Sequence, residues 1–485
     1  MIISELSKAS KLTFLSYANQ VISMLLAFFE AKVLTMNLSI TDYGAFNQIL
    51  TSVSLVSIVL CLNLGHGFIR FASSYDSDKK KQTFHTVLAT QTIIYTFALL
   101  LILPFSTKVS LFLTETEAYY PCVFIGFLAI IAGGISNIQN YLLVSGKDVM
   151  MIKQNLYRVI IDVLFVVIAV LLYPTILGAL LGYLFGELFC FLLFSIINHI
   201  DYHGIKVHKE ILVDLLRFSL PLIVGSVTYW VINSSNRYFI NYYWGLDYVG
   251  QFAIANRLPM MIVTIFTLLS TVFLSNTSRL FDNGDLSRVS YWFTNMIKVF
   301  ILFGVSGATL LIVANRSITL ILSTQEYLFP QIALFYLLLC VSSVSYGLLQ
   351  IVSRTYDLEK KVKRISLIWT IVLVINVLFN YILIPQYGLI GSAWASVITF
   401  VTGLVLVFVM RPKNIRFNLS WIKIGLFFIL SLILAYLITI VLSGYNFNIW
   451  LELLIASTVF IFVLVLGLLI RIIRFSELKQ LLYKN

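Results

Sequence analysis

The sequence predicts an all-α protein that crosses a membrane many times, and three observations indicate this. Of the 485 residues, 60% are hydrophobic and only 11% are charged, too little charge for the surface of a soluble protein of this length. Apolar stretches of about 20 residues recur along the chain, and a helix of that length crosses the ~30 Å hydrocarbon layer of a bilayer. These stretches do not alternate polar and apolar residues as β-barrel strands do, so the spans are expected to be helices.

Fourteen membrane-spanning helices are expected. They lie near residues 12–36, 44–71, 84–105, 119–144, 154–173, 176–198, 216–240, 248–278, 290–313, 329–353, 365–385, 388–410, 420–441 and 448–471. The first is too long for the core of a signal peptide, and no A-x-A-like cleavage site follows it, so it is expected to be retained. The four cysteines fall inside spans at wide separations, which predicts neither a disulfide framework nor a metal site.

The distribution of charge predicts that both termini are cytoplasmic. When the fourteen spans alternate across the membrane, nearly all of the 33 Lys and Arg residues fall on the side of the termini. The opposite loops contain only Lys108 and Arg316, while Lys32, Arg237 and Arg257 lie inside spans. Short loops rich in Lys and Arg mark the cytoplasmic side. The net charge of +12 is therefore expected to face anionic lipid, and no nucleic-acid partner is implied.

Two pairs of similar segments predict an internal repeat. The turn DYGAF (42–46) matches DYVGQF (247–252) with one insertion, and YPTILGALLGYLFG (173–186) pairs more weakly with IPQYGLIGSAWASV (384–397). Six spans separate the paired segments, so the repeats are expected to be parallel. The predicted organisation begins with a six-helix lobe (residues 1–200) and a cytoplasmic loop (201–213). A second six-helix lobe (214–410) follows, and the chain ends with a helix pair and a cytoplasmic tail (411–485).

These segments resemble those of a known transporter family. The turns DYGAFN and GLDYVGQFAIANRL, the segment LIPQYGLIGSAWAS and the fourteen spans are similar to the polysaccharide transporters of the MOP superfamily. That group includes the Wzx-type flippases of O-antigen and capsule, and it is similar in architecture to MATE multidrug exporters and lipid II flippases. The resemblance implies a MATE-like pair of lobes whose first, second, seventh and eighth helices line a central cavity.

The activity that the resemblance implies is transport across a bacterial cytoplasmic (inner) membrane. The substrate would be an undecaprenyl-diphosphate-linked oligosaccharide, moved from the inner to the outer leaflet. Membrane lipids and the polysaccharide polymerase machinery are the other implied partners.

Polar residues share one helical face in the expected cavity helices, at spacings near three and four or their multiples. They are Ser16, Asn19, Ser23 and Glu30 in the first span; Asn63, His66 and Arg70 in the second; Ser226, Tyr229, Asn233, Asn236 and Arg237 in the seventh; and Asn256 and Arg257 in the eighth. The fourth span has a polar face as well, with Asn137, Asn140 and Tyr141, so the pattern is not exclusive to the cavity helices.

Basic residues in these spans are candidates for binding a diphosphate or an acidic sugar, because Arg presents a planar fork of donors that fits phosphate oxygens. Arg257 lies roughly 13 Å into its span at 1.5 Å per residue, close to the midplane. Lys32 and Arg237 lie nearer the outer ends of their helices, where snorkelling to the interface is the alternative. The predicted substrate-binding residues are Arg257, Arg237, Lys32, Asn256, Asn233, Asn236, His66 and Asn63.

Three acidic residues are candidates for coupling transport to protons or sodium ions, since a buried carboxylate can carry a cation. They are Glu30, Glu187 and Asp162. Asp162 follows Arg158 by four residues, so an ion pair within one helix is the alternative. Glu187 has no evident partner in the sequence.

The sequence favours a transporter over an enzyme. It contains no G-x-x-x-x-G-K-[ST] nucleotide loop and no evident catalytic constellation, so no cofactor is expected. His199, His203 and His208 have a loose metal-like spacing, but a solvated loop explains them, so no metal is expected.

Three alternatives stay open. A membrane polysaccharide polymerase usually has a large extracytoplasmic loop, whereas the longest outer connections, 106–118 and 314–328, are short. A multidrug exporter of the same superfamily would favour buried acids, whereas the candidate cavity spans contain three basic residues and one acid. A lipid II flippase would also have a cationic cavity.

Overall fold

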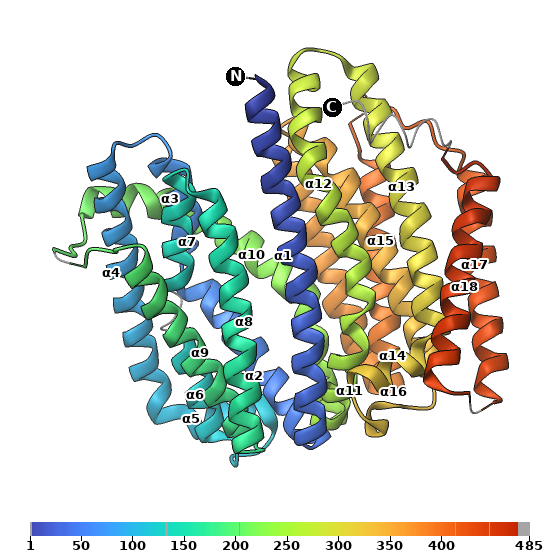
Figure 1. Cartoon of the computed structure of the whole chain (residues 1–485), viewed down its shortest axis with the longest axis horizontal. Coiled ribbons are helices and arrows are strands. Elements are labelled where there is room, and N and C mark those ends of the chain that lie inside the picture. Colours follow the sequence, from blue (N-terminus) through green and yellow to red (C-terminus); the bar gives the residue numbers. More distant parts are fainter. Residues whose placement is uncertain (1, 131–133, 203, 413, 446, 474–485) are drawn as a thin grey trace. The chain divides into compact units, whose positions relative to one another are not determined.

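The computed structural model describes residues 2–130, 134–202, 204–412, 414–445 and 447–473, apart from the side chains at 2–11, 13 and 265–276; His203 lies outside the described residues. Every regular element in the described ranges is helical, which confirms the all-α prediction (Figure 1). Eleven helices in these ranges are long and apolar enough to cross a membrane. The chain forms two compact units, residues Met1–Gly250 and Gln251–Asn485.

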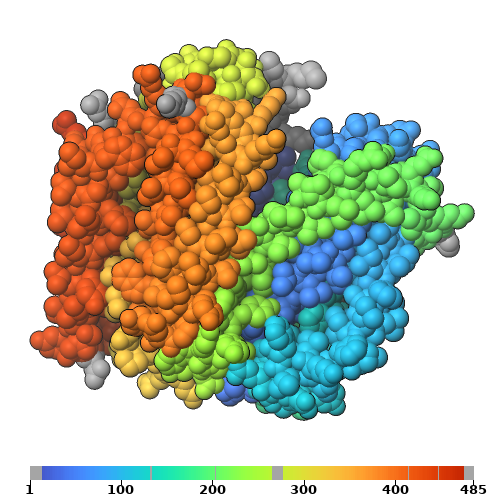
Figure 2. Space-filling model, turned by 180° about the vertical axis from the view of Figure 1, so that it is seen from behind, coloured from blue at the N-terminus to red at the C-terminus, as the bar shows by residue number. Residues whose placement is uncertain are grey.

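The first unit is built from long membrane helices interrupted by shorter ones. Its helices are α1 (Ile2–Asn37), α2 (Ile40–Leu60), α3 (Leu64–Ala72), α4 (Ser77–Ile102), η1 (Leu103–Phe105), α5 (Ser106–Thr114), α6 (Tyr120–Leu128), α7 (Gly134–Val144), α8 (Asp148–Leu172), α9 (Ile176–Ile197), α10 (Lys209–Trp244) and the start of α11 (Leu246–Arg257). In Figure 2, α10 (green) crosses over blue segments of the same unit, consistent with its packing against α2, α3 and α4.

The second unit has a densely packed interior around α13 and α15. Its helices are the end of α11, α12 (Pro259–Asp282), α13 (Leu286–Val313), α14 (Asn315–Leu322), η3 (Gln325–Tyr327), α15 (Ile332–Leu358), α16 (Val362–Val409), α17 (Trp421–Ser443) and α18 (Ile449–Leu469). The C-terminal pair α17 and α18 packs on α13. Arg316, at the start of α14, fixes this pair: its Nη1 donates to Glu452 Oε1 at 2.8 Å, and the Ser317 hydroxyl donates to the same buried carboxylate.

Breaks in three of the expected spans divide them into shorter helices. The span over 44–71 becomes α2 and α3 because Leu62 and Asn63 adopt positive φ angles of 50° and 51°. Asparagine is one of the few non-glycine residues that tolerate this conformation. The span over 119–144 contains α6 and α7, and that over 248–278 contains α11 and α12, with Pro259 at the start of α12.

The expected spans over 365–385 and 388–410 both lie in the element labelled α16, which consists of two helices that meet at a sharp break at Gly388 (φ 55°, ψ −127°), just after Pro385. The two helices fold back against each other: Asn376 Nδ2 donates to the Thr399 hydroxyl at 3.4 Å, and a Cβ added to Gly403 would lie 2.8 Å from Val372 Cγ2. Both expected spans are therefore present, joined by a tight turn. The count of fourteen spans stays a prediction, since length and composition alone identify eleven.

The small residues of α9 allow it to pack closely on α8. A Cβ added to Gly182 would lie 2.7 Å from the Phe165 carbonyl oxygen, and one added to Gly186 would lie 3.0 Å from Asp162 Oδ1. Small residues at spacings of four let membrane helices approach closely. This close packing sets the position of the acidic residues described below.

Candidate functional site

A polar interface joins α2 to α10 in the first unit, and we call it the α2–α10 seam. Three side-chain hydrogen bonds cross it: Arg237 to Thr51 (2.8 Å), Tyr238 with Ser52 (2.7 Å) and Trp230 to Ser54 (2.8 Å). A fourth, from Asn63 at the start of α3 to Ser226 on α10 (3.0 Å), extends the interface beyond α2. Both helices have polar groups on the facing sides, so the seam follows from the helical spacing of these residues. It brings together predicted site residues from the second and seventh spans.

Arg237 is the charged member of the seam. Its side chain is half-buried, and Nη1 donates to the Thr51 hydroxyl, which itself donates to the Asn47 carbonyl at 2.6 Å. The Thr51 hydroxyl thereby helps to hold the guanidinium in place. The seam therefore contains a positively charged group next to hydroxyl side chains.

The remaining predicted substrate-binding residues of the first unit lie around the seam. Asn236 is buried on α10, and Asn233 donates to the Tyr229 carbonyl one turn earlier at 2.7 Å. Lys32 is half-buried on α1, and His66 is exposed on α3. These residues share one unit, and the hydrogen bonds of Asn63 and Arg237 reach the opposite side of the interface.

Asn256 and Arg257 belong to the second unit. Both are half-buried, and Arg257 is the last residue of α11, directly before the break that Pro259 introduces. The helix is interrupted next to Arg257 because proline has no backbone N–H to donate and its ring clashes with the preceding turn.

Four polar residues of α2 escaped the sequence analysis. Gln48 is fully buried on α2, one turn before Thr51 and Ser52, and neither its Oε1 nor its Nε2 has a hydrogen-bond partner among the described residues. The signal was available, because a carboxamide inside an apolar span is costly unless it is paired or functional. Thr51, Ser52 and Ser54 were also missed, since hydroxyl residues are common in membrane helices.

The second polar group of the first unit is an acidic cluster around Arg158. The Arg158 guanidinium contacts Asp162 (Nε to Oδ2, 3.7 Å) one turn along α8 and forms an ion pair with Glu187 on α9. Glu187 is only 3% exposed. The interpretation that Glu187 lacks a partner is therefore wrong. The tight connection between α8 and α9 places residues 158 and 187 at similar heights in adjacent antiparallel helices.

The third predicted ion-coupling residue, Glu30, lies on α1, which packs along α8. Two of the three predicted acids, Asp162 and Glu187, thus share one arginine. A cavity of about 260 Å³ adjoins the cluster, and its lining includes Arg158, Glu187, Tyr183 and Ser57. Since a water molecule takes about 30 Å³ in the liquid, this space is large enough for several waters.

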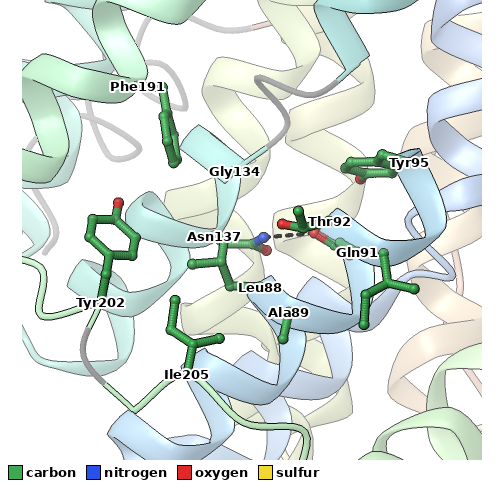
Figure 3. A pocket seen from close by; sticks show the side chains of 11 residues that line it. Leu88, Ala89, Gln91, Thr92, Tyr95, Gly134, Asn137, Phe191, Tyr202 and Ile205 are labelled. Carbon is green, nitrogen blue, oxygen red and sulfur yellow. Dashed lines mark hydrogen bonds between the residues drawn. The ribbon is translucent and has the colours of Figure 1, made fainter. Parts of the chain in front are cut away.

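The connection before α10 contributes Tyr202 and Ile205 to the lining of a second cavity, of about 400 Å³ (Figure 3). Asn137, from the polar face expected in the fourth span, donates to Gln91 at 2.6 Å inside it. Asp201 anchors the connection by pairing with Lys81 at 2.6 Å, and Tyr202 hydrogen-bonds Ser195 at 2.5 Å. Within the described residues, no group of three His, Cys, Asp or Glu side chains is placed to hold a metal ion.

Comparison with known proteins identifies the family. Residues 33–328 match the model of the family described as polysaccharide biosynthesis protein. The fold is similar to the lipid II flippase MurJ in an inward closed conformation (TM-score 0.72, 18% identity, covering 97% of this chain and 99% of that one).

The fold is also similar to two multidrug transporters. One is an inward-facing MATE family transporter of the MOP superfamily (TM-score 0.64, 13% identity, 81% and 96% covered). The other is the MATE multidrug transporter DinF-BH (TM-score 0.62, 14% identity, 83% and 94% covered). Among curated proteins, no sequence matches this chain. The chain belongs to the polysaccharide biosynthesis protein family and has the fold of MOP-superfamily membrane transporters.

Proposed function

We propose that this protein is a flippase for undecaprenyl-diphosphate-linked oligosaccharide repeat units. It would move them from the inner to the outer leaflet of a bacterial cytoplasmic membrane by alternating access between two lobes, residues 1–200 and 214–410. Both termini would be cytoplasmic. The family and the eleven long apolar helices support a membrane transporter that acts in polysaccharide synthesis.

The observation that carries the proposal is the position of Arg237 in the α2–α10 seam. Charged side chains in membrane spans are costly and usually face the protein interior or a water-filled path. The planar donors of Arg237 fit the oxygens of a diphosphate, and the hydroxyl of Thr51 fixes its orientation. A cationic drug would be repelled by this charge.

The other predicted residues have complementary roles in this proposal. Lys32 and Arg257 would supply further positive charge along the path of the diphosphate. Neutral polar side chains would contact the substrate or its hydration water without adding further charge to the path. They are Asn63, His66, Asn233, Asn236 and Asn256.

The acidic cluster is the proposed site of ion coupling. Asp162 and Glu187 share the single guanidinium of Arg158, and excess negative charge in a low-dielectric interior favours uptake of a proton or a sodium ion. Glu30, on the adjacent helix α1, is the third candidate. Such uptake would change how tightly Arg158 is held between α8 and α9. That exchange would link ion binding to the packing of the unit.

Deletion of the gene in the native host tests the proposed function. We expect lipid-linked repeat units to accumulate and surface polysaccharide to be lost, with rescue by the wild type and not by Arg237→Ala. Retained surface polysaccharide with altered drug sensitivity would instead favour a multidrug exporter. Accumulated cell-wall precursor would favour a lipid II flippase, and exported but unpolymerised repeat units would favour a polymerase.

A further inference from the structure

A separate cavity lies between α1, α7 and α8 in the first unit, and we call it the α1–α8 cavity. Its volume is about 500 Å³, within the range of about 300–1,000 Å³ typical of small-molecule sites. Uncharged polar side chains dominate its lining, and they are Ser16, Asn19, Gln20, Ser23, Gln139 and Asn155. It is distinct from the α2–α10 seam and from the acidic cluster.

The amide groups of this cavity are partly held in place before any ligand arrives. Asn19 is buried, its Nδ2 donates to the Ile152 carbonyl at 3.2 Å, and its Oδ1 accepts from the Ser23 hydroxyl at 3.2 Å. Gln139 differs, because its Nε2 is buried and has no hydrogen-bond partner among the described residues. Leaving such a donor unsatisfied costs about 1–3 kcal/mol, which a ligand oxygen would recover.

The chemistry of the lining selects one class of ligand. Among the described residues around the cavity there is no Lys, Arg, Asp or Glu, so neither a diphosphate nor a metal ion finds a counter-charge. An acyl chain would leave the amides unpaired. Carboxamides and hydroxyls together offer both donors and acceptors, as sugar hydroxyls require, and Met151 and Val159 offer an apolar surface for the C–H groups of a sugar ring.

We propose that the α1–α8 cavity binds the saccharide part of the substrate. This inference rests on the proposed function and assigns a second site to it, so that Arg237 holds the diphosphate and the cavity holds sugar. The α1 residues lie in the first half of the span Phe14–Asn37, and the α8 residues lie in the first half of Asp148–Leu172. Both halves are expected to face the cytoplasm, from which the flippase takes its substrate.

Binding of two probes to the purified full chain in detergent tests this proposal. The first probe is the host's repeat-unit oligosaccharide, released from its lipid diphosphate by mild acid, and the second is undecaprenyl diphosphate without sugar. We expect Gln139→Leu and Asn155→Leu to weaken oligosaccharide binding about tenfold each, since each removes a hydrogen-bonding group. Affinity for undecaprenyl diphosphate should stay unchanged. Ser457→Ala, at an exposed position on α18, is the matched control.

A protection experiment covers the case in which a leucine variant fails to fold. Asn155 is exposed at the cavity, so Asn155→Cys should react with a maleimide, and the oligosaccharide should slow that reaction; Ser457→Cys should not be protected. One outcome would overturn the saccharide site and leave the proposed flippase function intact. In that outcome the wild type binds both probes, the cavity variants bind the oligosaccharide as tightly as the wild type does, and the oligosaccharide does not protect Asn155→Cys. If the wild type binds neither probe, the proposed function fails.

Discussion

Gly44 and Gly250 occupy matching positions in the two repeat-related turns, and they lie against each other in the first unit. A Cβ at Gly44 would be 2.0 Å from the Leu246 carbonyl oxygen and 3.2 Å from the Gly250 amide nitrogen, while one at Gly250 would be 2.7 Å from the Ile40 carbonyl oxygen. Thr41 also donates to Asp247 at 2.5 Å. The motif that reveals the repeat in the sequence is therefore a contact surface between its two copies.

Gly44→Ala should destabilise the protein, because the added methyl group meets backbone that cannot move without shifting a helix. We expect a cost of about 1–3 kcal/mol, as for overpacking elsewhere, visible as a lower midpoint of thermal unfolding in detergent. Gly225→Ala is the matched control, since no described atom lies within 4 Å of its Cβ. Equal midpoints for the two variants would show that the turns do not pack as described.

Arg158→Ala should destabilise more than Glu187→Gln. Removing the guanidinium leaves Asp162 and Glu187 uncompensated near each other, at a cost of about 3–5 kcal/mol. Neutralising Glu187 leaves Arg158 with Asp162 as its partner. Chemical or thermal unfolding of both variants and of the double variant measures the coupling; additive effects would mean that the ion pair is not formed.

If the acidic cluster couples transport to an ion, Glu187→Gln should also uncouple it. Transport by the wild type should respond to an imposed proton or sodium gradient, and transport by Glu187→Gln should lose that response while substrate binding is retained. Glu326→Gln, a change in the outer loop at η3, provides the control. An unaltered gradient response in Glu187→Gln would remove the cluster from the coupling mechanism.

Arg316→Ala should loosen the C-terminal helix pair. Glu452 is 3% exposed and would lose its charged partner, so we expect a loss of about 3–5 kcal/mol. Lys108→Ala, which removes the other basic residue of the expected outer loops at an exposed position, should have little effect. Thermal unfolding compares the two, and a similar midpoint for both would contradict the described role of Arg316.

Arg257→Ala and Arg257→Lys should both impair export if this residue binds phosphate oxygens through two donors at once. Lysine keeps the charge but loses the planar fork. Accumulation of lipid-linked intermediates in the host, with protein levels checked, measures the effect. Full export by both variants would remove Arg257 from the substrate path.

Hydropathy was sufficient to predict the helical class and the approximate helix ranges, because a membrane requires long apolar helices. The breaks were harder to predict. Asn63 adopts its left-handed conformation where its side chain donates to Ser226, a contact between residues far apart in the sequence. The break at Gly388, by contrast, falls between two spans that the sequence predicts, just after Pro385. Local sequence does not contain the information that decides the break at Asn63.

The candidate site was predictable only in part. The pair of Arg158 and Glu187 could have been found by counting residues from the turn between α8 and α9. At 1.5 Å per residue, Arg158 lies roughly 21 Å before the end of α8 and Glu187 lies roughly 17 Å after the start of α9, so both are at a similar depth. A carboxamide inside an apolar span could have drawn attention to Gln48. Only the packed structure shows that the side-chain amides of Gln48 and Gln139 lack hydrogen-bond partners among the described residues.

Reconstituted transport tests the central claim most directly. Proteoliposomes containing the full chain and a fluorescent undecaprenyl-diphosphate-linked oligosaccharide would be treated from outside with a membrane-impermeant glycosidase. The flippase account predicts that the wild type exposes the substrate of the inner leaflet to digestion, and that Arg237→Ala does so far more slowly. Protein-independent digestion, or equal rates for the wild type and Arg237→Ala, would contradict it.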